Sequence, residues 1–519
     1  MKSVSIATKV VSRQCMLEAG RSMSGTLDNS LVSACICCCQ LGKVEWLWPT
    51  RVSADILIDF GVSNMFSTSM HGPHAQKKRI MANIYSKSFL QNSAQVQCNS
   101  QELLSKRILP LIQGFGNSGE PVDIHELNNA FTMDFMTAYQ FGLANSTNFT
   151  QNVEVRRQYL HLYHSRRGWQ FISSEIPPFV RKLLQRIGVS LYPDFIHKAN
   201  AWLEEWSRDM CDAADRYLKT LSSGPIPPTG DEPIVFKQYK TGLVALRQKD
   251  PMAGVEVHPH LDEGMNFTRG LAKRAVIVPD EQTTLLEVYS DMVDQLAAGH
   301  ETSGIALTYL FYELSRHPEI QTRLWHELST LDARLTWPSD NIQVPDAKYL
   351  DSLPYLQAVI MEVLRLHAPI PGMQPRISPT TPGGVSLGPP GSKHHYNGLP
   401  GDIRVSAMAY TLHKIETVFP EPETFKPERW LPSSSTEAEL IEMNRHFWAF
   451  GSGGRMCIGR HLAMQEIKLL VAAIWTNWRT TIVDDEGIEE VDAYTTRPRS
   501  GKLIVRFEQR DTTNVPQFT

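Results

Sequence analysis

The sequence predicts a mainly α-helical protein, on three observations. Apolar residues recur at helical spacing over residues 281–316, which predicts one long helix. Pro318 and Pro354 each stand where a proline is tolerated, in the first turn of a further helix. A third amphipathic stretch extends from Gly459 to Trp475 and carries a regular apolar face.

The other segments can be taken in chain order. Residues 74–89 combine basic and apolar side chains, which predicts a basic amphipathic helix, and helical patterns continue as far as Leu218. Residues 223–235 are rich in Gly, Pro and Ser and predict a loop. Pro279-Asp280 marks the start of the long helix, and residues 380–403 are turn-rich and strand-poor.

Composition bounds the class of protein. Of the 519 residues 42% are hydrophobic and 20% are charged, with a net charge of −4, which is typical of a globular protein. This mild acidity and the lack of a long basic run argue against a nucleic-acid-binding protein.

The cysteines do not form a disulfide framework. Four of the eight crowd into Cys35–Cys39, and no pair of Cys-x-x-Cys motifs predicts a zinc site. The cluster is either palmitoylated or simply small apolar filler, and we favour filler. A reducing compartment fits this usage best.

One cysteine stands apart, in the segment from Phe450 to Gly459, which reads Phe-Gly-Ser-Gly-Gly-Arg-Met-Cys-Ile-Gly. Glycines let a backbone approach a flat macrocycle, and the following helix would direct N–H groups at the Cys457 sulfur. A thiolate donates electron density to haem iron and favours cleavage of dioxygen. The alternative is a buried free cysteine beside a turn.

This segment resembles the haem-binding signature of the cytochrome P-450 superfamily. Three further motifs follow the order of that family: Ala-Gly-His-Glu-Thr at 298–302, Glu-Val-Leu-Arg at 362–365 and Pro-Glu-Arg-Trp at 427–430. His413-Lys414 and the segment 419–422 resemble fungal microsomal members. Four motifs spread over residues 298–459 must converge on one site.

The resemblance implies a single P-450 haem domain over residues 51–510. Its expected fold is mainly α with smaller β-sheets, and a long central helix lies over a buried haem. Residues 1–50 are unassigned, and residues 511–519 form a C-terminal tail.

The cofactor implied is haem b with Cys457 as the axial iron ligand. Phe450 is expected to pack on the sulfur side, Gly451 and Gly459 to shape the loop, and Ala298 to leave room for oxygen. The resemblance assigns the two haem propionates to a set of basic residues. They are Arg455, Arg376, Lys78 and His74, although His74 could equally be a helix cap.

Glu301 and Thr302 are the expected catalytic residues. A hydroxyl and a neighbouring carboxylate beside the iron can deliver the protons that oxygen activation requires. Alternatively, Thr302 bonds back to a helix carbonyl and Glu301 is a solvated residue.

Glu362 and Arg365 lie three residues apart on one helix face, so they can form an ion pair. The resemblance adds Arg429 and places a buried structural network behind the haem loop. An ordinary surface pair is the alternative.

Substrate contacts follow from the resemblance only. The expected residues are mostly apolar and suit a lipophilic ligand, although each is equally compatible with plain core. They are Met292, Leu296, Ile370, Met373 and Thr495.

The function expected is a haem-thiolate monooxygenase that uses O2 to oxidise a lipophilic small molecule in fungal secondary metabolism. Electrons would come from a separate NADPH-cytochrome P-450 reductase, docked near Arg460 and Lys468, with cytochrome b5 as a possible second donor. The alternatives are an isomerase or dehydratase with the same fold and a non-catalytic haem-binding protein.

The location implied is the cytoplasmic face of the endoplasmic reticulum. However, the best early apolar run, Leu31 to Leu41, is about half the length of a spanning helix. The open alternatives are a peripheral protein and a shortened chain.

Overall fold

A computed structural model of the chain describes residues 60, 62–167, 183–184, 186–188, 192–221, 229–255, 279–331, 335–339, 342–388, 390–391 and 395–510. The N-terminal segment 1–50, the tail 511–519 and the cysteine cluster at 35–39 lie outside these residues.

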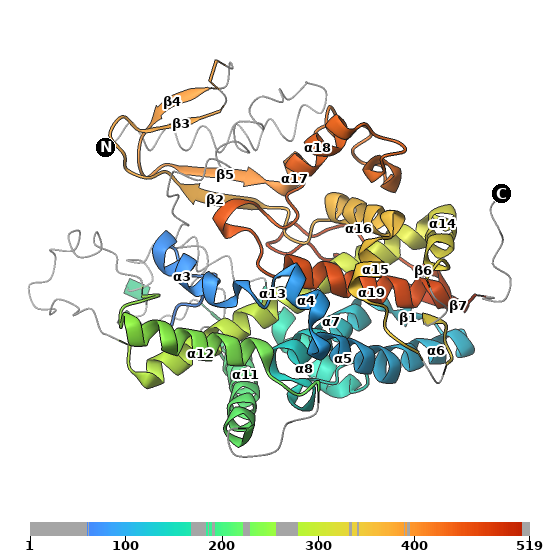
Figure 1. Ribbon diagram of the computed structural model, residues 1–519, viewed down its shortest axis with the longest axis horizontal. Helices are drawn as coiled ribbons and strands as arrows, with labels where there is room; N and C mark the ends of the chain where they lie inside the picture. Colours follow the sequence, from blue (N-terminus) through green and yellow to red (C-terminus); the bar gives the residue numbers. More distant parts are fainter. Residues whose placement is uncertain are drawn as a thin grey trace, which may run out of the picture.

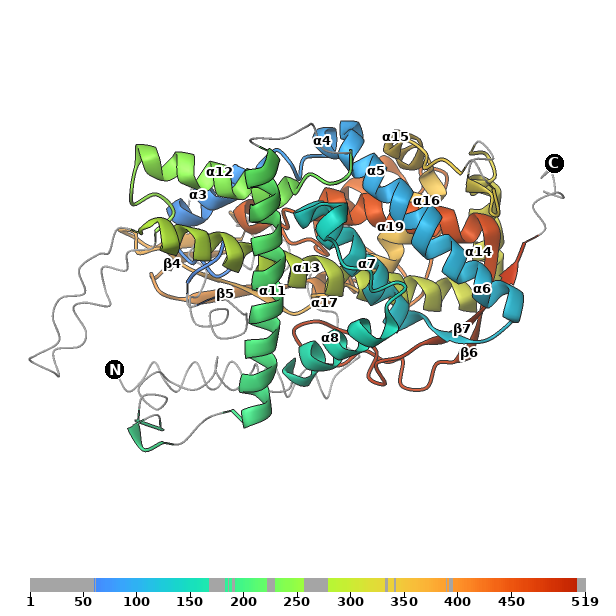
Figure 2. The same cartoon turned by 90° about the horizontal axis from the view of Figure 1, so that it is seen from below.

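The described chain is mainly helical (Figures 1 and 2). The first helices are α3 (His71–Ala82), α4 (Lys87–Asn92), α5 (Ala94–Leu103), α6 (Leu109–Ser118), α7 (Ile124–Phe141), α8 (Val153–Ser165), α11 (Asp194–Leu221) and α12 (Ile234–Lys249). They are followed by α13 (Glu281–Arg316), α14 (Pro318–Leu328), α15 (Ala347–Asp351), α16 (Pro354–Leu366), α17 (Ala409–Leu412), α18 (Glu437–His446) and α19 (Arg460–Asn477).

Short antiparallel sheets flank these helices. The strands are β1 (Val122–Asp123), β2 (Met373–Ile377), β3 (Val385–Leu387), β4 (Tyr396–Leu399), β5 (Arg404–Met408), β6 (Trp478–Asp484) and β7 (Ile504–Gln509). They pair in the orders β1-β7-β6, β2-β5 and β3-β4. The expected fold class, mainly α with smaller sheets, is confirmed.

The helices that the prolines predict are present. Helix α13 begins directly after Asp280, whose side chain accepts a hydrogen bond from the backbone N–H of Thr283 at 2.7 Å. It ends at Arg316, and α14 begins at Pro318, as expected. Helix α16 likewise begins at Pro354.

Two sequence predictions need correction. Residues 74–89 do not form one helix, because α3 ends at Ala82 and α4 begins after Ser86. The Ser86 hydroxyl caps α4 by accepting a hydrogen bond from the N–H of Phe89, which favours a new helix start over continuation. Residues 380–403 are less strand-poor than expected, since β3 and β4 pair there between turns.

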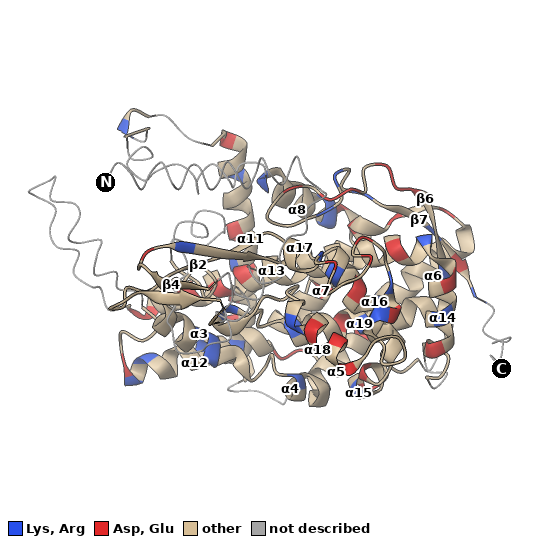
Figure 3. Ribbon diagram, turned by 90° about the horizontal axis from the view of Figure 1, so that it is seen from above, with Lys and Arg blue, Asp and Glu red and all other residues tan. Residues whose placement is uncertain are grey.

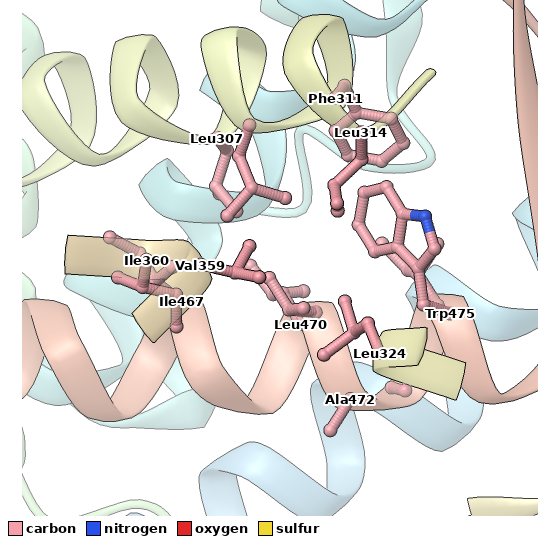
Figure 4. Close-up of a cluster of buried hydrophobic side chains, with 14 of the residues drawn as sticks. Leu307, Phe311, Leu314, Leu324, Val359, Ile360, Ile467, Leu470, Ala472 and Trp475 are labelled. Carbon is pink, nitrogen blue, oxygen red and sulfur yellow. The ribbon is translucent and has the colours of Figure 1, made fainter. Parts of the chain in front are cut away.

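The core is built around α13, which packs against α7, α14, α16 and α19 (Figure 4). Phe311 and Trp475 are fully buried, with ring centroids 4.6 Å apart. Leu314, Leu324 and Val359 join the same cluster. The packing fixes α13 relative to α16 and α19, which carry or adjoin the predicted site residues.

The middle of α13 is not buried on one side. From Glu287 to Phe311 every residue is buried except 297–299 and Thr302. Ala298 is exposed although it lies at the centre of a core helix. The helix therefore faces open space at the segment that the sequence singles out.

No helix in the described part of the chain has both the length and the hydropathy that a bilayer-spanning segment needs. Charged residues of both signs are spread over the described elements (Figure 3).

Candidate active site

The loop before α19 turns sharply to present Cys457. The Cys457 N–H donates to the Phe450 carbonyl at 2.9 Å, which closes the loop. Gly451 and Gly453 have φ values of +66° and +70°, which favour glycine. At Gly451 an added Cβ would also lie 2.9 Å from the Gln374 amide oxygen.

The Cys457 sulfur lies at the N-terminus of α19. Burial raises the pKa of the Cys457 thiol above its ordinary value and outweighs the N–H groups of Gly459 and Arg460 and the charge of Lys78, which lower it. The cysteine is nevertheless accessible to solvent. Two N–H donors and a cation beside a solvent-accessible sulfur suit a thiolate whose proton has been replaced by a metal ion.

The predicted basic residues gather beside the loop. Burial, followed by the charges of Arg455, Lys78, His71 and Arg376, lowers the pKa of His74 to about 3. The four charges act on His74 because their side chains lie near it.

Two of these cations are held by carbonyl groups. Lys78 Nζ donates to the carbonyls of Gly454 at 2.9 Å and Met456 at 2.6 Å. Arg455 Nη2 donates to the carbonyls of Thr68 and Ser69. The cluster therefore joins α3 to the cysteine loop, and Arg376 reaches it from β2.

These residues fit a haem. The cluster supplies cations for two propionates, and the thiol supplies an axial ligand. Burial and Tyr139 raise the pKa of Tyr85, and the charges of Cys457 and Asp294 raise it further. Because Asp294 lies on α13 and both charges act on the same phenol, the thiol lies near α13. The open segment at 297–299 then leaves space for a flat group between α13 and the cysteine loop.

Thr302 lies on the open face of α13. Its Oγ1 donates to the Ala298 carbonyl at 2.6 Å. This is the back-bonded arrangement that the sequence leaves open as an alternative. It does not exclude catalysis, because the hydroxyl oxygen stays available as an acceptor.

Glu301 points to a different side of the helix. Its carboxylate is 5% exposed and contacts Arg167, the Tyr163 hydroxyl at 2.8 Å and the Thr495 hydroxyl at 2.8 Å. The solvated alternative for Glu301 is therefore wrong. Within the described chain no hydrogen bond joins Glu301 to Thr302.

Glu362, Arg365 and Arg429 form a buried network. Arg365 contacts both Glu362 carboxylate oxygens, at 2.7 and 2.9 Å, and Arg429 Nε contacts one of them at 3.0 Å. Their exposed fractions are 0%, 1% and 5%, so the surface-pair alternative is wrong. Trp430 Nε1 also donates to Glu362, at 2.8 Å, a contact that sequence reasoning missed although Trp430 lies in the quoted motif.

A histidine connects this network to the cysteine loop. His413 Nδ1 donates to the Arg365 carbonyl at 2.8 Å, and its Nε2 accepts from the Trp448 N–H at 2.8 Å. Burial lowers the pKa of His413 to about 3, which keeps the ring neutral and suited to both roles. The sequence offered no signal for this link beyond the His413-Lys414 dipeptide.

The expected substrate contacts separate into two groups. Met292 and Leu296 are 0% and 2% exposed and belong to hydrophobic clusters, so the structure places them in the core. Met373 is 59% exposed, Ile370 is half-buried and Thr495 contacts Glu301.

Sequence reasoning missed Tyr494. The residue is 48% exposed, and burial raises the pKa of its phenol. The charges of Asp294, Glu301 and Cys457 raise its pKa further, which places the phenol among these groups. Its position beside Thr495 was the only available signal.

Comparisons with known proteins agree with this geometry. The family model for cytochrome P450 matches residues 262–505. A cytochrome P450 monooxygenase of Aspergillus versicolor, avaI, is 28% identical over 415 residues, which cover 79% of this chain and 83% of the relative. The cytochrome P450 monooxygenase FGM1 of Gibberella zeae is 25% identical, covering 86% and 77%.

A solved structure supports the fold. The haem domain of cytochrome P450DA superposes with a TM-score of 0.62 at 17% identity and covers 94% of this chain and 87% of its own. Together with the cysteine loop, the cation cluster and the Glu362 network, these comparisons make the chain similar to cytochrome P450 proteins and, in sequence, to fungal cytochrome P450 monooxygenases.

Proposed function

We propose that this protein is a haem-thiolate monooxygenase that oxidises a lipophilic small molecule of fungal secondary metabolism. The observation that carries the proposal is the convergence of Cys457, four basic residues and the open face of α13 on one place. Bound haem b would supply the activation of O2, with one oxygen atom entering the substrate and the other leaving as water.

The residues of the chain have distinct roles in this proposal. Cys457 holds the iron, and the backbone N–H groups of Gly459 and Arg460 moderate the charge on its sulfur. His74, Lys78, Arg376 and Arg455 bind the propionates. No single element supplies these groups, so haem binding depends on the whole fold.

Proton delivery falls to Thr302 and Glu301. The Thr302 hydroxyl lies on the open face of α13 and can pass a proton to a ligand there. Glu301 lies behind the helix and is the nearest acid in sequence, so it would replenish that proton through water.

The electron donor is a separate NADPH-dependent reductase, with cytochrome b5 as a second candidate. The docking face lies on the Cys457 side, where Arg460 is exposed. Lys468 does not belong to it, because this side chain is buried and pairs with Asp351 at 2.6 Å. Attachment to the cytoplasmic face of the endoplasmic reticulum rests on the resemblance to microsomal members.

The test is turnover under labelled dioxygen. The purified protein, a P450 reductase and NADPH are incubated under ¹⁸O₂ with a panel of terpenoids, polyketides and alkaloids. A product that carries one ¹⁸O atom is expected. An unlabelled rearrangement or dehydration product would favour the isomerase or dehydratase alternative, and no product with any compound would favour a non-catalytic haem protein.

A further inference from the structure

The Glu301 carboxylate is held by three side chains from outside its own helix. Tyr163 reaches it from the last turn of α8, Arg167 from just beyond the end of that helix, and Thr495 from the segment before β7. Both carboxylate oxygens are engaged, Oε1 by Arg167 and Thr495 and Oε2 by Tyr163. A carboxylate with all these contacts has one orientation.

Arg167 is the one cation among these three side chains, and its guanidinium is held by Glu301. Its side chain is 10% exposed. Its Nε and Nη1 atoms are buried and have no acceptor among the described residues, so Nη2 makes the only hydrogen bond of the guanidinium there. The guanidinium also lies 5.6 Å from the centre of the Tyr163 ring.

The ionisation of Glu301 depends on this arginine. Burial raises the pKa of Glu301, but the charge of Arg167, followed by His300 and the hydrogen bonds from Tyr163 and Thr495, outweighs it. The net effect lowers the pKa of Glu301. Without the arginine, burial dominates and favours the neutral acid.

Other titratable groups surround the pair. His164 lies next to Tyr163 on α8, and Arg166 directly follows that helix. His300 is on α13, His125 is on α7, and Arg497 lies two residues after Thr495. Burial, and then the charge of Arg167, lowers the pKa of both His164 and His125, so these histidines are neutral near pH 7. They do not replace Arg167 as the cation that faces Glu301.

We propose that Arg167 is a positioning residue that fixes the Glu301 carboxylate behind α13 for proton delivery at Thr302. This inference rests on the proposed function. Arg167 does not touch the reacting atoms, and it acts through the orientation and charge of Glu301. Replacing it by a neutral residue should leave substrate binding unchanged and disturb the protonation step.

The first test needs no substrate. The infrared C=O band of a protonated carboxylic acid is recorded at pH 7 for the wild type, R167Q, R167K and R167Q/E301Q. We expect an additional acid band in R167Q that is absent from the other three proteins. An R167Q spectrum identical to that of the wild type would overturn the proposal.

Thermal unfolding provides the second readout. Removing one charge leaves the other buried without its partner, whereas the double variant R167Q/E301Q removes both. We expect the melting temperature of R167Q/E301Q to be higher than that of R167Q, and this comparison also decides the case in which R167Q yields no soluble protein. Additive losses of melting temperature would contradict the proposal.

The third readout uses the compound that gives most product under ¹⁸O₂. R167Q should release more peroxide per NADPH, by about threefold or more, because an acid–base group is displaced. R167K should restore coupling, whereas R157Q should match the wild type, since Arg157 on α8 is largely exposed and pairs with Glu126. Unchanged coupling in R167Q would overturn the inference while the wild-type product upholds the proposed function. A wild type without product overturns the proposed function. The presence or absence of the acid band in R167Q then decides whether Arg167 controls the ionisation of Glu301.

Discussion

Glu362 accepts hydrogen bonds from two arginines and a tryptophan at distances of 2.7–3.0 Å. The arginines also donate to carbonyls, since Arg365 Nη1 binds those of His413 and Pro422. The carboxylate has no access to water, so its stability depends on these partners. Each residue of the set is therefore expected to matter more than a surface ion pair.

The variant Arg365→Ala tests this dependence. It leaves Glu362 buried with one cation, at a cost of about 3–5 kcal/mol, which is a large part of a typical stability of about 5–15 kcal/mol. We expect haem-free, poorly soluble protein. Soluble yield and haem content per chain measure the effect, and a variant that purifies with full haem would show that the network does not support the loop.

Thr302→Ala tests the open face of α13. The variant keeps the helix, so haem content and substrate affinity should equal those of the wild type. Product per NADPH should fall by about tenfold, and peroxide should rise in proportion, because the hydroxyl that passes the proton is absent. Equal coupling in the two proteins would mean that Thr302 only bonds to its helix.

Among the elements, those with strong local signals were predictable. Helix α13 has a long apolar pattern and a capping aspartate, and α14 and α16 begin with proline, so their starts follow from the sequence. The break between α3 and α4 depends on one serine cap, which a periodic pattern does not reveal. The β3–β4 pair combines short strands with glycine-rich turns, which hides the strands.

A histidine bridges two carboxylates from different parts of the chain. His367, which follows α16, contacts Glu313 of α13 at 2.8 Å and Glu490 at 2.7 Å, and it stacks on Tyr309. Burial opposes protonation of the ring, but the hydrogen bonds and charges of Glu313 and Glu490 outweigh it and raise the pKa of His367. The two acids that the ring bridges therefore favour its protonated form.

This bridge predicts a pH dependence of stability. The pKa of His367 is higher in the folded than in the unfolded protein, so its contribution is complete below the ordinary value of about 6.5 and is lost as pH rises through the folded pKa. His367→Gln should reduce the melting temperature more at pH 6 than at pH 9. An equal reduction at both pH values would contradict a charged bridge.

At the scale of the molecule, the site is assembled from segments far apart in the chain. α3, α13, β2 and the loop before α19 each contribute. The residues of α13 and of the loop lie in recognisable motifs, whereas those of α3 and β2 were assigned from the resemblance alone. Arg167, Tyr494 and the two contacts of His413 have no such motif, and they depend on tertiary packing. Met292 and Leu296, which the resemblance alone suggested as substrate contacts, lie buried in hydrophobic clusters.

A site of this kind couples cofactor binding to stability. Haem that binds only the folded chain stabilises it by about 4 kcal/mol at a concentration 1,000 times its Kd. Haem-free protein should therefore melt at a lower temperature, and added haem should restore the melting temperature. The cations beside the loop contribute to this, since they repel one another and lower the pKa of His74. Equal melting temperatures with and without haem would contradict the assembled site.

The most direct measurement is the absorption spectrum of the reduced carbon monoxide complex, recorded for the wild type and for Cys457→Ser. Thiolate ligation by Cys457 predicts a strongly red-shifted Soret band in the wild type. It also predicts little retained haem and no such band in the variant. A wild-type spectrum without the red shift, or a variant that keeps it, would contradict the assignment of Cys457 as the axial ligand.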